Sequence, residues 1–138
     1  MAKRKILIVD DEHDFSKALK IRLKTKGYDV VLAYDSLQAI LIANQEKPDL
    51  IVLDVMIPGE DGFMVTERLK QSQNTRHIPI LFLTGVPGGE GKAFKLGASG
   101  YIMKPYHPEK LLETIQKTLE IKATQSGQKV EETIGLAI

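Results

Sequence analysis

The alternation of apolar and polar positions divides the chain into five short apolar runs separated by longer amphipathic segments. The apolar runs are rich in β-branched residues and Leu, which is typical of strands buried on both faces of a parallel sheet. They predict strands over residues 5–9, 28–33, 50–53, 78–83 and 101–103. The third run is the most distinctive, because it leads directly into a lone carboxylate, Asp54, and then into a Pro-Gly break at residues 58–59.

The segments between these runs have the apolar spacing of helices. The first helical segment stops at Gly27, a residue type that commonly ends helices. Ser36 is the predicted N-cap of the second helix, and Pro108 opens the last one. The remaining helices are predicted over residues 61–72 and 90–96. Strands that alternate with helices in this way predict an α/β fold with a parallel sheet and right-handed crossovers.

The composition is that of a globular protein with one domain. The chain has 138 residues, 43% of them hydrophobic, which is enough to bury a core. Its net charge of +1 gives no electrostatic reason to expect direct binding of nucleic acid or of a membrane. The absence of cysteine excludes disulfides and thiolate chemistry, and no apolar run is long enough to span a bilayer. We therefore expect a cytoplasmic location.

We assign residues 1–121 to the domain and residues 122–138 to a tail. The tail starts with a polar stretch and regains apolar residues at Val130, Ile134 and Ile138, which are spaced four apart. This pattern leaves two interpretations open, a linker or chain end without fixed structure, and a helical extension that binds a partner.

Chemically active side chains follow four of the predicted strands. Asp10 and Asp11 follow the first strand, Asp54 the third, Thr84 the fourth and Lys104 the fifth. Since the carboxyl ends of parallel strands meet at one edge of a sheet, we expect these side chains to converge there. Three carboxylates repel one another unless cations are present, and an all-oxygen ligand set favours Mg²⁺. A carboxylate nucleophile beside a metal, a lysine and a hydroxyl is suited to phosphoryl transfer.

Four stretches of the chain resemble the receiver domain of two-component response regulators. They are ILIVDDE at residues 6–12, LIVLDVMIPGEDG at 50–62, LT at 83–84 and GASGYIMKP at 97–105. The resemblance covers residues 4–121. It implies a flavodoxin-like, doubly wound sheet of five parallel strands in the order 2-1-3-4-5, with five helices in a three-layer α/β/α arrangement. It also implies a signalling switch in a phosphorelay, activated when Asp54 accepts a phosphoryl group.

The resemblance implies a role for each site residue. Asp54 would be the phosphoacceptor, Lys104 its ion-pair partner, and Thr84 the hydroxyl that bonds the phosphoryl group. Tyr101 would be a switch aromatic that turns inward as Thr84 moves toward the phosphoryl group. The cofactor would be Mg²⁺, and its implied ligands are Asp11 directly, Asp10 largely through water, Asp54, and the backbone carbonyl of Met56.

One segment departs from the family pattern. The stretch between Thr84 and Gly97 is shorter than is usual in receiver domains, and it contains Pro87 and glycines at 88, 89 and 91. These residues predict a short or late-starting fourth helix.

The resemblance also implies the partners. The phosphoryl donor would be a sensor histidine kinase or a phosphotransfer protein, and the output would go to a downstream protein or to an effector domain missing from this chain. A second copy of the chain, in a homodimer that depends on phosphorylation, is a further partner that the resemblance implies. No direct contact with nucleic acid or membrane is expected. The domain would not be an enzyme in the ordinary sense, because it would catalyse only its own phosphoryl transfer and dephosphorylation.

Three alternative functions can be weighed against this one. A Mg²⁺-dependent phosphohydrolase with an Asp nucleophile would need a second Asp as general acid at the position of Met56. A dinucleotide-binding domain would need a glycine-rich turn where the chain has Asp10 and Asp11. A receiver-like interaction module that is not phosphorylated would not require the complete set of site residues that this chain carries.

Overall fold

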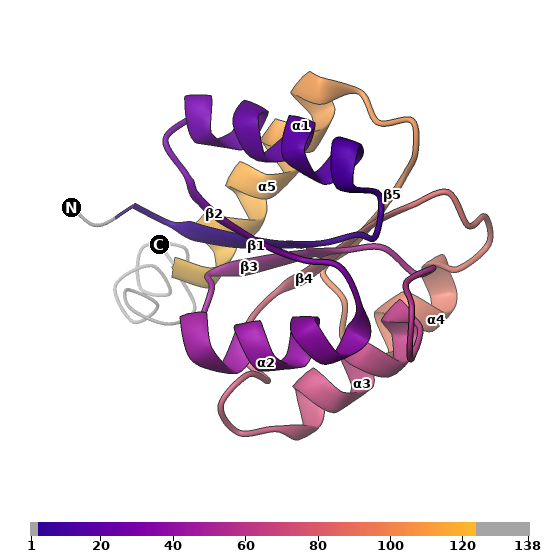
Figure 1. Cartoon of the computed structure of the whole chain (residues 1–138). Coiled ribbons are helices and arrows are strands. Elements are labelled where there is room, and N and C mark those ends of the chain that lie inside the picture. Colours follow the sequence, from indigo (N-terminus) through magenta and orange to yellow (C-terminus); the bar gives the residue numbers. More distant parts are fainter. Residues whose placement is uncertain (1–2, 124–138) are drawn as a thin grey trace, which may run out of the picture.

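Residues 3–123 are described by the computed structural model, and they form a parallel sheet between two layers of helices (Figure 1). The strands are β1 (Lys5–Val9), β2 (Asp29–Ala33), β3 (Leu50–Leu53), β4 (Ile80–Thr84) and β5 (Gly100–Met103). They are hydrogen-bonded in the order β2-β1-β3-β4-β5, and each neighbouring pair is parallel. The flavodoxin-like architecture and the strand order expected from the sequence are confirmed.

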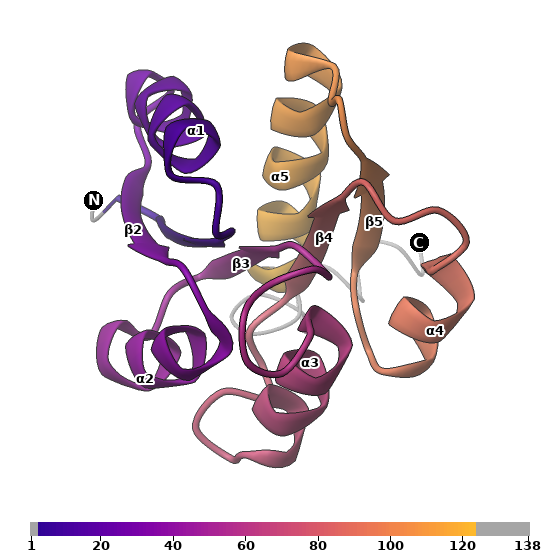
Figure 2. The ribbon, with the colours of Figure 1, turned by 45° about the vertical axis from the view of Figure 1, so that its right-hand side comes forward.

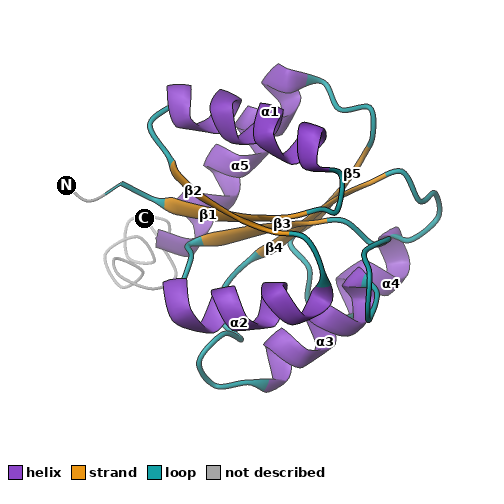
Figure 3. Cartoon of the chain, in the orientation of Figure 1, coloured by secondary structure: helices purple, strands orange, loops and turns teal. Residues whose placement is uncertain are grey.

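The helices cover both faces of the sheet (Figure 3). They are α1 (His13–Thr25), α2 (Ser36–Glu46), α3 (Gly62–Gln71), α4 (Glu90–Lys95) and α5 (Pro108–Ala123). α1 and α5 lie on one face, and α2, α3 and α4 lie on the other (Figure 1). A second view shows α4 next to α3 and beside β5, at one side of the molecule (Figure 2).

Two hydrophobic clusters, one on each face of the sheet, hold the layers together. Leu7 and Val9 of β1 belong to the cluster under α2, α3 and α4, whereas Ile6 and Ile8 belong to the cluster under α1 and α5. This alternation follows from the two-residue repeat of a strand, and it explains why the strands read as continuous apolar runs. Burying each side chain of this size contributes roughly 1.5–3 kcal/mol.

The ends of the elements differ from the prediction at several places. The N-cap of α2 is Asp35, whose side chain accepts a hydrogen bond from the backbone N–H of Gln38, so the assignment of the cap to Ser36 was wrong. The Ser36 hydroxyl instead accepts a hydrogen bond from the N–H of Glu60, across to the loop after β3. β4 begins at Ile80, two positions later than predicted, after Pro79, which cannot donate to the ladder.

The short fourth helix is confirmed, because α4 has only six residues. The last helix runs to Ala123, two residues past the predicted end of the domain at position 121. The rest of the predicted tail, including Val130, Ile134 and Ile138, lies outside the described residues. No helix within residues 3–123 is long and apolar enough to cross a membrane.

Candidate functional site

The three central charged residues of the site each lie one position beyond the carboxyl end of a strand. Asp10 follows β1, Asp54 follows β3 and Lys104 follows β5. Their backbone N–H groups still bond the last carbonyl of the neighbouring strand, with N···O distances of 3.1 Å from Asp10 to Ala33, 3.0 Å from Asp54 to Val9, and 2.8 Å from Lys104 to Thr84. The ladder therefore fixes the backbone from which each charged side chain projects.

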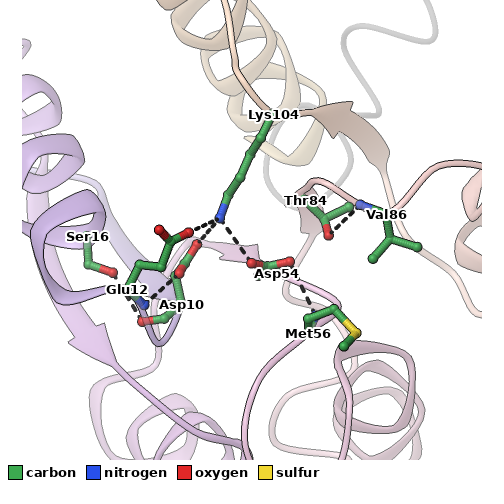
Figure 4. A network of polar contacts seen from close by, with 8 residues as sticks. All are labelled: Asp10, Glu12, Ser16, Asp54, Met56, Thr84, Val86 and Lys104. Atoms are coloured by element: carbon green, nitrogen blue, oxygen red, sulfur yellow. Dashed lines mark hydrogen bonds and ion pairs between the residues drawn. The ribbon is translucent and has the colours of Figure 1, made fainter.

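Lys104 joins the carboxylates into one network (Figure 4). Its ammonium nitrogen lies 2.7 Å from Oδ2 of Asp10, 3.0 Å from Oδ2 of Asp54 and 3.2 Å from Oε1 of Glu12. The side chains of Asp10, Asp54 and Lys104 are only 3%, 9% and 16% exposed, whereas that of Glu12 is 65% exposed. The Lys104–Pro105 peptide bond is cis.

Burial and ion pairing act against each other in this network. Burial raises the pKa of Asp10, although the hydrogen bonds from Lys104 and from the Glu12 N–H oppose that shift. Burial on its own would lower the pKa of Lys104, but its hydrogen bonds to Asp10 and Asp54 outweigh this effect and raise the pKa above its usual value. Lys104 is therefore a fixed cation, and one cation faces three carboxylates. The remaining negative charge favours the approach of a second cation.

Thr84 and Tyr101 both contact the loop between β4 and α4. The hydroxyl of the fully buried Thr84 accepts a hydrogen bond from the N–H of Val86 at 3.3 Å, and the Tyr101 hydroxyl donates one to the carbonyl of Val86 at 2.6 Å. The half-buried ring of Tyr101 packs against Phe82, with ring centroids 5.7 Å apart. The backbone of Val86 thus connects the predicted hydroxyl donor to the predicted switch aromatic.

The structure does not bring all the predicted residues into the network. Asp11 is exposed and makes no hydrogen bond or ion pair with the described residues. Met56 is also exposed; its N–H donates to Oδ1 of Asp54 at 3.3 Å, and its side chain extends away from the carboxylates (Figure 4). The structure therefore gathers Asp10, Asp54 and Lys104, with Asp11 and Met56 beside them.

The oxygen-only donor set fits Mg²⁺. Within residues 3–123, no three Asp, Glu, His or Cys side chains are grouped closely enough to form a metal site by themselves. Mg²⁺ does not need such a cage, because it keeps several waters and uses one or two carboxylates. Oδ1 of Asp10 accepts one hydrogen bond from the Glu12 N–H, and Oδ1 of Asp54 accepts one from the Met56 N–H. Each of these oxygens keeps a lone pair for a metal or a metal-bound water.

Two of the residues that contact Lys104 were not predicted from the sequence. Glu12 is the third carboxylate on the ammonium, and the ring of Phe15 lies beneath it, with 4.2 Å between the ammonium nitrogen and the ring centroid. Glu12 directly follows the acidic pair, which was a usable signal. Phe15 reads as an ordinary apolar position of a helix, so the sequence offered no sign of its second contact.

A cavity in the described part of the chain lies away from this site. It has a volume of about 660 Å³ and is lined by the end of α3, the loop before β4 and the last turns of α5, including Lys70, Arg76 and Lys122. These segments lie at the opposite edge of the sheet from Asp54. The network around Lys104 is separate from this cavity, and of its members only Glu12 is largely exposed.

Comparison with known proteins identifies the family. The sequence profile of the response regulator receiver domain matches residues 6–116. The chain belongs to this family, and the resemblance seen in the motifs is confirmed.

Curated relatives are transcriptional regulators. The chain is 40% identical over 137 residues to the alkaline phosphatase synthesis transcriptional regulatory protein PhoP of Bacillus subtilis, which covers 96% of this chain and 56% of PhoP. It is 39% identical over 117 residues to the DNA-binding dual master transcriptional regulator RpaA of Synechocystis, which covers 83% of this chain and 48% of RpaA. The chain thus spans about half the length of the curated relatives it matches.

Solved structures share the fold. A CheY-like receiver domain protein from Methanospirillum hungatei superposes with a TM-score of 0.85 at 26% identity, covering 91% of this chain and all of the other. The receiver domain of a sensor histidine kinase from Pseudomonas aeruginosa has a TM-score of 0.78 at 28% identity, covering 86% of this chain and 99% of its own. That structure contains a magnesium ion in its active-site cleft.

Proposed function

We propose that this receiver domain is a phosphorylation-activated switch of a two-component phosphorelay, and that Asp54 accepts the phosphoryl group. The observation that carries the proposal is the position of Lys104, whose ammonium joins the buried carboxylates of Asp10 and Asp54 at the end of the sheet. A nearly buried, negatively charged site with one fixed cation is prepared for a metal and for a phosphoryl group, and it is costly for a purely structural role.

The phosphoryl group would come from a phosphohistidine donor. An oxygen of the Asp54 carboxylate attacks phosphorus in line, the P–N bond breaks, and the imidazole nitrogen keeps the electron pair. The product is an acyl phosphate on Asp54. Lys104 offsets charge that develops on the phosphoryl oxygens, and the Thr84 hydroxyl offers a hydrogen bond to one of them. Mg²⁺, held by Asp10, Asp11, Asp54 and the Met56 carbonyl, would supply further positive charge to these oxygens.

The contacts of Val86 support a route from the site to the surface. The Thr84 hydroxyl can donate to a phosphoryl oxygen while its own oxygen accepts from the Val86 N–H, so movement of Thr84 toward the phosphoryl group pulls on the backbone of Val86. The Val86 carbonyl, on the same residue, is held by Tyr101. Movement of Thr84 therefore changes the loop that fixes Tyr101, and the face formed by α4, β5 and α5 changes with it.

The partners follow from the family and from the charge of the chain. The donor is a sensor histidine kinase or a phosphotransfer protein, and phosphorylation can also favour a homodimer. The longer transcriptional relatives support output through an effector domain joined to the receiver, with protein–protein contact by the α4, β5 and α5 face as the other route. The net charge of +1 supports a receiver domain that does not bind nucleic acid itself, so any contact with nucleic acid would be made by such a separate domain. We propose a cytoplasmic location on the family resemblance, and catalysis restricted to the domain's own phosphorylation and dephosphorylation.

The proposal is tested by intact-mass measurement after incubation with Mg²⁺ and acetyl phosphate. The wild-type chain should gain one phosphoryl group, and Asp54→Ala should gain none. Asp14→Ala is a matched control, because Asp14 is an exposed acid in the first turn of α1 outside the network, and it should be labelled like the wild type. Equal labelling of wild type and Asp54→Ala would reject the assignment. No labelling of the wild type would favour an interaction module, and sustained release of phosphate over many turnovers would favour a phosphohydrolase.

A metal titration tests the ligand assignment. Asp11→Ala should weaken Mg²⁺ binding much more than Glu12→Ala, because Asp11 is the proposed direct ligand and Glu12 bonds Lys104. Equal effects of the two substitutions, measured by calorimetric titration of Mg²⁺, would contradict the assignment.

A further inference from the structure

The ammonium group of Lys104 is fully occupied in this structure. An ammonium has three N–H donors, and Lys104 contacts three carboxylates, those of Asp10, Asp54 and Glu12. A phosphoryl oxygen can bind Lys104 only after one of these carboxylates leaves. The site therefore contains a competition for one donor, and the geometry indicates which partner gives way.

Glu12 is the most easily displaced of the three. Its carboxylate is the farthest from the ammonium, at 3.2 Å, and it is the only one of the three that is largely exposed. Glu12 stands at the N-cap of α1, but its side chain makes no capping hydrogen bond, so nothing else in the described chain holds the carboxylate in place. Exposed ion pairs of this kind are weak, and water readily replaces the lost contact.

Phe15 is the part of the Lys104 environment that stays fixed. Its ring lies 4.2 Å from the ammonium nitrogen, within the range of a cation–π contact. The ring also meets Tyr106 edge to face, with centroids 6.0 Å apart and planes at 87°, and it packs against the cluster under α1 and α5. This contact is independent of which oxygen accepts from the ammonium, so it can keep Lys104 extended across the site during the exchange.

We propose that Glu12 and Phe15 are positioning residues that act through Lys104, and the proposal rests on the phosphoacceptor function above. Phe15 holds the ammonium over the site in both states. Glu12 occupies the donor that the phosphoryl group takes over, and so it opposes phosphorylation until it is displaced. Glu12 lowers the affinity of the site for a phosphoryl group, and Phe15 raises it.

The exchange at Glu12 is tested with beryllium trifluoride, a non-covalent analogue of a phosphoryl group, in saturating Mg²⁺. Glu12→Gln should bind the analogue about two- to fivefold more tightly by calorimetry, since a neutral amide competes less well for Lys104. Asp14→Asn makes the same change in charge in the same turn without touching Lys104, so its affinity should stay within about twofold of wild type. Equal gains in both variants, or no gain in Glu12→Gln, would overturn the role of Glu12.

The positioning role of Phe15 is tested by measurements that a loss of ordinary packing would not change. Phe15→Leu should lower the affinity for beryllium trifluoride about three- to tenfold. Phe15→Tyr keeps the aromatic face and should bind the analogue like the wild type. In the metal-free protein, the Lys104 ε-protons should lose their upfield ring-current shift in Phe15→Leu and keep it in Phe15→Tyr. An unchanged ring-current shift of the Lys104 ε-protons in Phe15→Leu would overturn the positioning role of Phe15. An equal loss of analogue affinity in Phe15→Leu and Phe15→Tyr would also overturn it.

The two proposals fail in different ways. Loss of phosphorylation by acetyl phosphate in the wild-type chain would remove the proposed function itself. A wild-type chain that is phosphorylated, together with Glu12 and Phe15 variants that bind the analogue like wild type, would remove only the positioning roles. Thermal denaturation of each variant shows whether the fold is retained.

Discussion

Replacing Gly89 by alanine should move Tyr101 away from the loop after β4. Gly89 precedes α4 with φ −91° and ψ −2°, a conformation that any L-residue adopts, so the substitution puts no strain on its own backbone. A Cβ at this position would collide with the Tyr101 hydroxyl and would lie 2.8 Å from Cζ of the same ring and 3.0 Å from Cζ of Phe63. Of these neighbours, the half-buried Tyr101 is the freest to turn outward.

The size of the effect follows from the contacts that Tyr101 would lose. Its hydrogen bond to the Val86 carbonyl contributes about 0.5–1.5 kcal/mol. The contact between its ring and Phe82 contributes about 0.5–1.5 kcal/mol more. Together they favour the observed position by about 1–3 kcal/mol, so Gly89→Ala should shift the ratio of the two Tyr101 positions by roughly 5- to 150-fold.

Nuclear magnetic resonance of ring-labelled tyrosine can follow the shift, because the chain has only four tyrosines. Burial raises the pKa of Tyr101, and repulsion from Glu90 and Asp54 raises it further. In Gly89→Ala the Tyr101 signal should lose its shift from the Phe82 ring, and its pKa should return toward the ordinary value of 10.0. The spectrum of Tyr101→Phe assigns the signal.

Gly91→Ala is the matched control for Gly89→Ala. A Cβ at Gly91 meets nothing within 4 Å, and Ala in a helix is more stable than Gly by roughly 0.5–1 kcal/mol, so this variant should be slightly stabilised with an unchanged Tyr101 signal. An unchanged Tyr101 signal and pKa in Gly89→Ala would refute the reasoning, because it would mean that the loop yields and the ring does not.

Three further predictions concern stability. Lys104→Gln leaves two nearly buried carboxylates without their cation and should lower the free energy of unfolding by roughly 2–4 kcal/mol in metal-free buffer, with partial recovery in Mg²⁺. Lys117→Gln, which removes one partner of an exposed pair, should cost less than about 0.5 kcal/mol, and urea unfolding that gives equal losses would contradict the prediction. Because burial raises the pKa of Asp10 above 3.8, the folded state holds this proton more tightly, so Asp10 contributes stability below pH 3.8 that is lost as the pH rises through the raised pKa. The difference in unfolding free energy between wild type and Asp10→Asn should therefore fall from acid toward neutral pH, and a rise would show that the sign is wrong. Gly62→Ala should lower the free energy of unfolding by about 1–3 kcal/mol, because a Cβ there would collide with the Asp54 carbonyl and lie 2.9 Å from the Cα of Val55, and a melting temperature close to that of wild type would contradict this.

Much of the fold could be predicted because each strand is buried on both faces. Burial on both faces requires apolar residues at successive positions of a strand, so each strand appears in the sequence as a continuous apolar run. Because the strands are parallel, the acids and the lysine that follow these runs lie at one edge of the sheet. The start of a helix is harder to predict, because it can depend on a contact with a distant part of the chain. Ser36 and Asp35 are both good caps, but the Ser36 hydroxyl is bonded to the N–H of Glu60 in the loop after β3, and Asp35 caps the helix.

The parts of the site that could not be predicted depend on contacts between residues far apart in the chain. The contact of Phe15 with Lys104 joins α1 to the residue after β5, and nothing in the apolar pattern of α1 separates this position from its neighbours. The hydrogen bond between Tyr101 and Val86 depends on the path of a glycine-rich loop. Asp11 was predicted as a metal ligand, and that assignment stays a prediction; the structure shows that Asp10, and not Asp11, bonds Lys104.

The backbone hydrogen bonds of Asp10, Asp54 and Lys104 have a consequence for how this site can be altered. Each N–H bonds a carbonyl of the adjacent strand, and an amide hydrogen is the same whichever side chain the residue carries. These backbone hydrogen bonds therefore do not depend on the charged side chains, although the burial of those side chains limits which residues fit. The amide hydrogens of the three positions should exchange as slowly as those of the strands they extend, in the wild type and in variants that keep the fold.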